Sequence, residues 1–114
     1  MLIVEDEYLI AMDLQLMLEA AGWDVLGPVP TVRGALSLLD DELPSVALLD
    51  VSLGNEPVTA VAEALKARGV PFAVASAYES PERFGGEVLA GAPNVGKPTG
   101  RKRLLATLDQ LTEA

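Results

Sequence analysis

Four apolar residues and one acid decide the fold of this chain: Val46-Ala-Leu-Leu-Asp50, followed by Val-Ser-Leu-Gly-Asn55. A short uninterrupted apolar run is typical of a strand that is buried on both faces, as in a parallel sheet. Its last residue is a carboxylate, which has no reason to lie in a core. Ligands of open α/β sheets bind beyond the carboxyl ends of the strands. Asp50 is therefore the first candidate for a reactive group.

Strand and helix signals alternate along the whole chain. We expect five strands, at Met1–Val4, Trp23–Val29, Val46–Leu49, Phe72–Ser76 and Asn94–Gly96. A helix is expected after each strand. The first covers Leu9–Ala21, the second is capped by Thr31 and ends near Asp41, and the third covers Val58–Arg68 with Pro57 in its first turn. The fourth is a glycine-rich segment from Ser80, and the last begins at Thr99 or Gly100. This pattern predicts one α/β domain over residues 1–114. Its sheet should be parallel and five-stranded, in the flavodoxin-like order 2-1-3-4-5, with helices on both faces.

The composition excludes several kinds of catalytic site, metal site and partner. Cysteine is absent, which excludes thiol chemistry and fits the cytoplasm, and histidine is absent, which excludes Ser-His-Asp catalysis and His-based zinc sites. The net charge of −9 argues against a nucleic-acid partner. The apolar runs are too short for a membrane span. Any bound metal must be held by oxygen, which favours a hard cation such as Mg²⁺.

Five polar side chains lie at the ends of the expected strands: Glu5, Asp6, Asp50, Ser76 and Lys97. Because the carboxyl ends of parallel strands share one edge of the sheet, we expect these groups to converge there. Close carboxylates repel one another, and a divalent cation relieves that repulsion. A lysine and a hydroxyl supply donors for a tetrahedral anion. Together the groups describe a phosphoryl-transfer site with Asp50 as nucleophile.

Each of these groups alone has an ordinary explanation. Acids are common at helix starts, Asp50 suits a turn, Ser76 suits a helix cap, and a single lysine is usually a surface residue. The basic run Arg101-Lys102-Arg103 is first a solvated helix face and second part of a partner-binding surface. Only the combination, ordered along the chain, favours a functional site.

The ordered pattern resembles the receiver domain of response regulators over essentially the whole chain. That family has an acidic pair after the first strand, a phosphoacceptor Asp after the third, Thr or Ser after the fourth and Lys-Pro after the fifth. Here Glu5-Asp6, Asp50, Ser76 and Lys97-Pro98 occupy those places. Two segments, Asp50–Gly54 and Pro71–Tyr78, are similar to a subgroup of stand-alone alphaproteobacterial receivers with a Phe-Ala-Thr-Gly-Tyr-like fourth strand.

The resemblance implies a single-domain response regulator of a two-component phosphorelay. Asp50 would accept a phosphoryl group from a histidine kinase or histidine phosphotransfer protein, Lys97 would pair with a phosphoryl oxygen, and Ser76 would hydrogen-bond it on activation. The implied Mg²⁺ ligands are Asp6, Asp50, the backbone carbonyl of Ser52 and, through water, Glu5. Such a protein is a phosphoacceptor rather than a turnover enzyme. It would act by altered binding of a downstream protein, or by passing on or draining phosphate.

One position departs from the family pattern. Receivers usually carry Tyr or Phe three residues before the lysine, where its rotamer reports phosphorylation, and this chain has Asn94 there. We predict that Tyr78 takes over the switching role. The glycine-rich segment from Gly85 to Gly91 would then let a mobile fourth helix respond.

Three other functions stay open. Gly91–Lys97 has the spacing of a nucleotide-binding P-loop, but Pro98 replaces the Ser or Thr that would hold Mg²⁺. A phosphohydrolase using Asp50 would want a further acid where Ser52 stands. The third alternative is a receiver-like module that docks on a partner without being phosphorylated.

Overall fold

A four-stranded parallel sheet forms the centre of the molecule. The computed structural model describes residues 1–54, 56–76, 86–97 and 99–113. The sheet has the order β2-β1-β3-β6, with β1 at Leu2–Val4, β2 at Leu26–Val29, β3 at Ala47–Asp50 and β6 at Phe72–Ala75. All three neighbouring pairs are parallel. The predicted fold class is thus confirmed, with its first four strands in the expected order.

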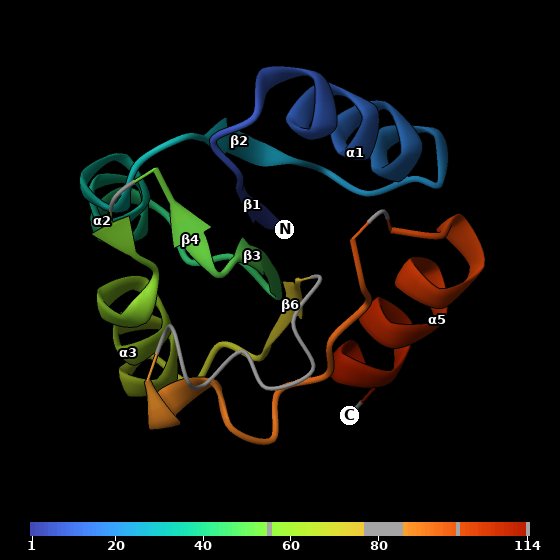
Figure 1. The fold of residues 1–114 in the computed structure, drawn as a ribbon. Coiled ribbons are helices and arrows are strands. Elements are labelled where there is room, and N and C mark those ends of the chain that lie inside the picture. Colours follow the sequence, from blue (N-terminus) through green and yellow to red (C-terminus); the bar gives the residue numbers. More distant parts are fainter. Residues whose placement is uncertain (55, 77–85, 98, 114) are drawn as a thin grey trace.

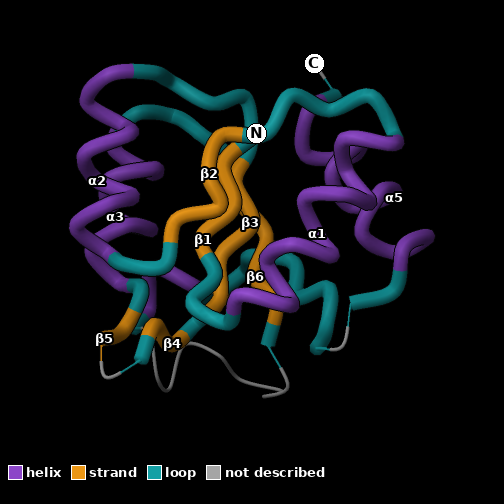
Figure 2. Tube along the Cα trace, turned by 90° about the horizontal axis from the view of Figure 1, so that it is seen from above, coloured by secondary structure: helices purple, strands orange, loops and turns teal. Residues whose placement is uncertain are grey.

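Helices cover both faces of this sheet. Helices α2 (Val32–Asp41) and α3 (Thr59–Ala67) lie on one face, and α1 (Tyr8–Ala20) and α5 (Arg101–Thr112) lie on the other (Figure 1 and Figure 2). Thr31 caps α2 as predicted, because its hydroxyl oxygen accepts a hydrogen bond from the backbone N–H of Gly34 at 3.0 Å. Within the described ranges, no helix combines the length and the apolar character needed to cross a bilayer.

The strands sort their side chains alternately between two cores. Residues facing α2 and α3 include Leu2, Val4, Ala47, Leu49, Phe72 and Val74. Residues facing α1 and α5 include Ile3, Val46, Leu48, Ala73 and Ala75, which pack with Leu104 and Leu108 of α5. Because successive strand residues point to opposite faces, an uninterrupted apolar run is needed to fill both cores. Truncating a buried leucine such as Leu48 or Leu49 to alanine should cost about 2–5 kcal/mol.

One prediction about the strands is confirmed only roughly, and one about the third helix is wrong. The segment expected as the fifth strand, Asn94–Gly96, lies parallel beside β6 as predicted, but it pairs through a single bridge between Asn94 and Val74. Pro57 does not lie in the first turn of α3. It belongs to β5 (Glu56–Pro57), which pairs antiparallel with β4 (Ser52–Leu53) directly after β3. The backbone N–H of Val58 then bonds the carbonyl of Val51 at 3.1 Å, so α3 begins only at Thr59.

Other boundaries shift by a few residues. Strand β2 begins at Leu26 rather than Trp23, because the chain leaves α1 through Gly22 in the left-handed region, at φ 96°, and extends only afterwards. The predicted fourth helix falls largely outside the described residues. Its described part is a single 3₁₀ turn, η1 (Glu87–Leu89), which follows Gly86.

Candidate functional site

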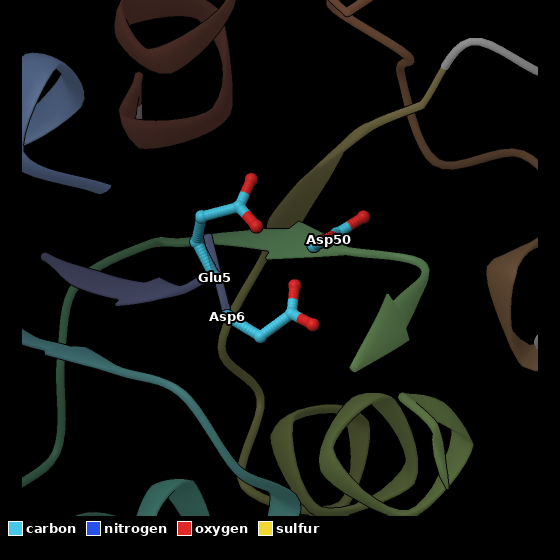
Figure 3. Close-up of side chains that lie close together, drawn as sticks. All are labelled: Glu5, Asp6 and Asp50. Carbon is cyan, nitrogen blue, oxygen red and sulfur yellow. The ribbon is translucent and has the colours of Figure 1, made fainter. Parts of the chain in front are cut away.

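Three carboxylates meet at the carboxyl edge of the sheet. Strands β1 and β3 are hydrogen-bonded neighbours with Val4 opposite Leu49, so Glu5 and Asp6 follow β1 beside Asp50 at the end of β3. Figure 3 shows the three side chains turned toward one common space. One oxygen of each lies within 4.8 Å of the others. The ladder between two paired strands therefore fixes the spacing of the acids.

Lys97 brings a positive charge to the same cluster. Its ammonium nitrogen Nζ lies 3.2 Å from Glu5 Oε1, 3.2 Å from Asp50 Oδ2 and 3.6 Å from Glu7 Oε1. It donates a hydrogen bond to Asp50 Oδ2. Burial acts to lower the pKa of Lys97, but the contact with Glu5 and the charges of both buried carboxylates outweigh it, so the pKa is raised. The ammonium therefore stays charged.

Glu5 is the most perturbed acid of the cluster. The residue is only 3% exposed, and burial is the main reason that its pKa rises to about 7. A hydrogen bond from the Glu7 backbone N–H to Glu5 Oε2 lowers the pKa, whereas the neighbouring Asp50 raises it. The other oxygen, Oε1, is buried and lies in ion-pair range of Lys97, but no described donor is aligned to hydrogen-bond it. Such an orphaned oxygen has capacity for a further positive partner.

Asp6 stands in a different environment, exposed at the mouth of the cluster. Its Oδ2 accepts a hydrogen bond of 2.8 Å from the backbone N–H of Gly54, in the turn between β4 and β5. Partial burial acts to raise the pKa of Asp6. The bond from Gly54 and the contacts with Glu5 and Asp50 outweigh it, so the pKa lies below its usual value. Asp6 is therefore ionised at neutral pH and ready to bind a cation.

The donor set fits a hard divalent cation. Glu5, Asp6 and Asp50 offer only oxygen, two of the three are buried, and one buried oxygen lacks an aligned donor among the described residues. Oxygen ligands with carboxylate charge suit Mg²⁺. Ser52, whose backbone carbonyl was predicted as a further ligand, begins β4 two residues after Asp50, and its role stays a prediction.

Ser76 and Asn94 lie at the end of β6. Ser76 is buried and directly follows that strand, and its backbone N–H donates to Asn94 Oδ1 at 3.1 Å. The same oxygen accepts the N–H of Gly96 at 2.9 Å. The position that departs from the family pattern thus makes defined hydrogen bonds. Tyr78 and Pro98 lie outside the described residues.

Sequence reasoning missed three contributors to this site: the charge of Glu7 near Lys97, the Gly54 N–H that holds Asp6, and the carboxamide of Asn94. The first two depend on tertiary contacts that no local pattern reveals. The third had a signal, because Asn followed two residues later by Gly is typical of an Asx turn.

The Gly91–Lys97 segment does not serve as a P-loop in this structure. Its lysine is engaged by Asp50 and Glu5, and its backbone runs beside β6, where the Val95 N–H bonds the Val74 carbonyl at 2.9 Å. A P-loop lysine would instead be directed toward bound phosphates at the start of a helix.

Comparisons with known proteins point to one family. No family model matches the chain. The chain is 36% identical over 113 residues to the phyllosphere-induced regulator PhyR of Methylorubrum extorquens, in a match that covers 96% of this chain and 42% of PhyR. The chain therefore spans less than half of the length of that curated relative.

Solved structures agree with this relationship. SdrG from Pseudomonas melonis Fr1, in its BeF₃-activated conformation, superposes with a TM-score of 0.77 at 36% identity, covering 98% of this chain and 94% of SdrG. The anti-anti-sigma factor PhyR from Bartonella quintana gives a TM-score of 0.78 at 31% identity, covering 96% of this chain and 45% of that one. The signal receiver domain of a modulated diguanylate cyclase from Desulfovibrio desulfuricans G20 gives a TM-score of 0.83 at 28% identity, covering 97% of this chain and 90% of that one. These relatives, together with the acids, Ser76 and the lysine at the carboxyl edge of the sheet, assign the chain to the response-regulator receiver domains.

Proposed function

We propose that this receiver domain, residues 1–114, accepts a phosphoryl group on Asp50 as part of a cytoplasmic two-component phosphorelay. The observation that carries the proposal is the position of Lys97, whose Nζ lies 3.2 Å from Asp50 Oδ2 beside the acid cluster. A lone strand-end aspartate would need no such partner. An aspartate that receives phosphate needs a cation for the new phosphoryl oxygens.

The chemistry follows from the positions of the side chains. A carboxylate oxygen of Asp50 attacks the phosphorus of a phosphohistidine, a P–O bond forms, and the P–N bond breaks with its electron pair going to the imidazole. Under this proposal Lys97, which hydrogen-bonds Asp50 Oδ2, would move that bond to a phosphoryl oxygen, and Ser76, buried at the end of β6, would hydrogen-bond another. Mg²⁺ held by Asp6, Asp50 and the Ser52 carbonyl, with Glu5 acting through water, would neutralise charge that develops on the transferring group.

The test uses acetyl phosphate as a small phosphodonor. In the presence of Mg²⁺, the wild-type protein should gain the mass of one phosphoryl group, and peptide mapping after borohydride reduction should place it on Asp50. Chelation of Mg²⁺ should abolish the gain. Incorporation of phosphate at another residue, or none at all, would refute the proposal. Multiple turnover of phosphate esters would instead favour the phosphohydrolase alternative.

The exposed apolar side of α1 supports a protein as the natural donor. Tyr8 is 72% exposed, Leu9 73% and Leu16 61%, with Leu9 and Leu16 about two turns apart on the helix. A donor histidine must approach Asp50 from the edge where α1 begins. We expect Leu16→Glu to slow phosphotransfer from a histidine kinase or histidine phosphotransfer protein while leaving phosphorylation by acetyl phosphate unchanged. Equal slowing with both donors would mean that the helix affects the pocket itself.

A second candidate is docking on a partner without phosphorylation. It is favoured by one observation, the similarity to PhyR, a protein described as an anti-anti-sigma factor of which this chain spans less than half. Under this alternative, the Asp50→Asn variant would bind the downstream protein as tightly as the phosphorylated wild type. Under the phosphorelay proposal, only the phosphorylated wild type gains or loses that affinity, which a pull-down titration measures.

A further inference from the structure

The segment beside β6, residues 93–95, pairs with Val74 but stops pairing before it reaches Ser76. The Val74 N–H bonds the Pro93 carbonyl at 2.9 Å, and the Val95 N–H bonds the Val74 carbonyl at 2.9 Å. In a continuing parallel ladder, the Ser76 N–H would next bond the carbonyl of Val95. It bonds Asn94 Oδ1 instead, at 3.1 Å. A side chain has therefore taken the place of the next rung.

The same carboxamide oxygen also turns the chain. It accepts the N–H of Gly96 at 2.9 Å, which is the geometry of an Asx turn, and Gly96 has φ 83°, in the left-handed region. The turn is held further by Thr99 Oγ1, which donates to the Gly96 carbonyl at 2.8 Å. Lys97 follows directly, with its ammonium on Asp50 and Glu5. The direction of Lys97 thus depends on a turn that Asn94 closes.

Asn94 is tied to α5 as well. Arg103 Nη2 donates to the Asn94 backbone carbonyl at 2.7 Å. One residue therefore links three parts of the molecule: the end of β6 that carries Ser76, the turn that carries Lys97, and the first turn of α5.

From these contacts we infer that Asn94 is a positioning residue. Its carboxamide holds Ser76 and Lys97, the two groups that would contact the phosphoryl group, in fixed register across two chain segments. The functional part of this inference rests on the proposed phosphoryl transfer. The proposed metal-binding acids do not depend on Asn94, because Glu5, Asp6 and Asp50 lie on or beside the paired strands β1 and β3.

Three variants separate the roles of the carboxamide. Asn94→Leu keeps most of the volume and removes the acceptor. Asn94→Ala removes the acceptor without added bulk, in case the leucine prevents folding. Asn94→Asp keeps an acceptor oxygen and serves as the conservative variant. Thr31→Val is the matched control. It removes a side-chain oxygen that accepts a hydrogen bond of similar length, 3.0 Å, from the backbone N–H of Gly34, away from the site.

The first measurement is amide hydrogen exchange by NMR. Removing the acceptor should speed exchange at Ser76 and Gly96 by about tenfold, the equivalent of one net hydrogen bond, and Asn94→Asp should restore the protection. The side-chain NMR signals of Lys97 should shift in the leucine and alanine variants and return toward wild type in the aspartate variant. Thr31→Val should alter exchange at Gly34 alone.

The second measurement is the rate of phosphorylation by acetyl phosphate. Asn94→Leu and Asn94→Ala should slow it by about tenfold or more, because misplacement of contacting groups by a fraction of an ångström is costly, with Mg²⁺ affinity unchanged. Wild-type rates in folded variants that have lost protection at Ser76 and Gly96 would overturn the inference, and so would unchanged protection. If the wild type itself takes up no phosphate, the proposed function fails. The exchange and Lys97 signals then still decide whether Asn94 positions the two groups.

Discussion

The two halves of the pocket are built in different ways. Glu5, Asp6 and Asp50 are placed by the ladder between β1 and β3, in which every described residue of β1 has a partner. Ser76 directly follows β6, which pairs with β3, but the position of Lys97 relative to Ser76 depends on one isolated bridge and on the side chain of Asn94. The acidic half is therefore fixed by backbone pairing of two strands, whereas the two members of the donor half are joined mainly through the Asn94 carboxamide. The comparison teaches that the two halves can be damaged separately.

The largest effect should come from Asp50→Asn, which removes the residue that both halves share. We expect no detectable phosphoryl incorporation from acetyl phosphate, because a neutral amide is not a nucleophile at phosphorus. Intact-protein mass spectrometry measures the result. Asp40→Asn is the control, since Asp40 is an exposed carboxylate on α2 paired with Arg68. Incorporation by the Asp50→Asn variant would show that another residue accepts the phosphate.

Next in size should be Lys97→Met, which damages the donor half alone. Loss of a charged donor to the developing phosphoryl charge should slow phosphorylation by about 10²- to 10³-fold. Binding of Mg²⁺ should persist or strengthen, because the competing ammonium is gone from Glu5 and Asp50. Phosphorylation rates and calorimetric titration with Mg²⁺ check the two parts, with Lys66→Met as an exposed control on α3. Loss of Mg²⁺ binding would show that the halves are not separable.

Asp6→Asn tests the acidic half from its exposed side. The amide oxygen can still accept the bond from Gly54, so the turn between β4 and β5 should hold while one negative charge is lost. We expect Mg²⁺ affinity to fall by at least about 10- to 100-fold, since that is the typical loss when a residue supporting a metal ligand is changed, and Asp6 is proposed as a ligand itself. Calorimetric titration measures it. Unchanged affinity would place the cation away from Asp6.

The smallest expected effect is on the pH dependence of stability without Mg²⁺. The pKa of Glu5 is raised from 4.5 to about 7, so the folded protein holds this proton more tightly than the unfolded chain does. Its contribution is fully present below pH 4.5 and is lost as the pH rises through about 7. At about 1.4 kcal/mol per pKa unit, we expect a loss of about 1–3 kcal/mol of unfolding free energy.

Urea unfolding at several pH values checks this expectation. Glu5→Gln should flatten the decline, whereas Glu63→Gln, an exposed glutamate of α3, should not. Saturating Mg²⁺ should restore stability on the alkaline side, because a ligand that binds only the folded state stabilises it by about 2.7 kcal/mol at a hundred times its Kd. An equal decline in the Glu5→Gln variant would assign the dependence to other groups.

Much of this architecture could be predicted from local sequence. The apolar runs of β1, β3 and β6 must fill two cores at once, which leaves little freedom for another assignment. Thr31 marks the start of α2 because its hydroxyl satisfies a backbone N–H that the helix leaves open. The carboxyl-edge rule then brings the terminal acids and the lysine together.

The errors arise where tertiary contacts override local preference. Pro57 fits the start of a helix by its fixed φ, but pairing of β4 with β5 places it in an extended segment instead. The expected fifth strand is cut short because the Asn94 carboxamide competes with the backbone for the Ser76 N–H. The pairing of β4 with β5 is not visible from local sequence, whereas the turn at Asn94 had a signal in the Gly two residues later.

The alternation of side chains along β3 has a consequence for how this domain tolerates insertions and deletions. Leu48 belongs to the core beside α1 and α5, Leu49 to the opposite core, and Asp50 points with Leu48 because strand residues alternate. One extra residue between Leu49 and Asp50 would preserve the hydrophobic run yet swing the carboxylate through the plane of the sheet, away from Lys97. An insertion that keeps the apolar character of this strand would therefore still separate the Asp50 carboxylate from Lys97.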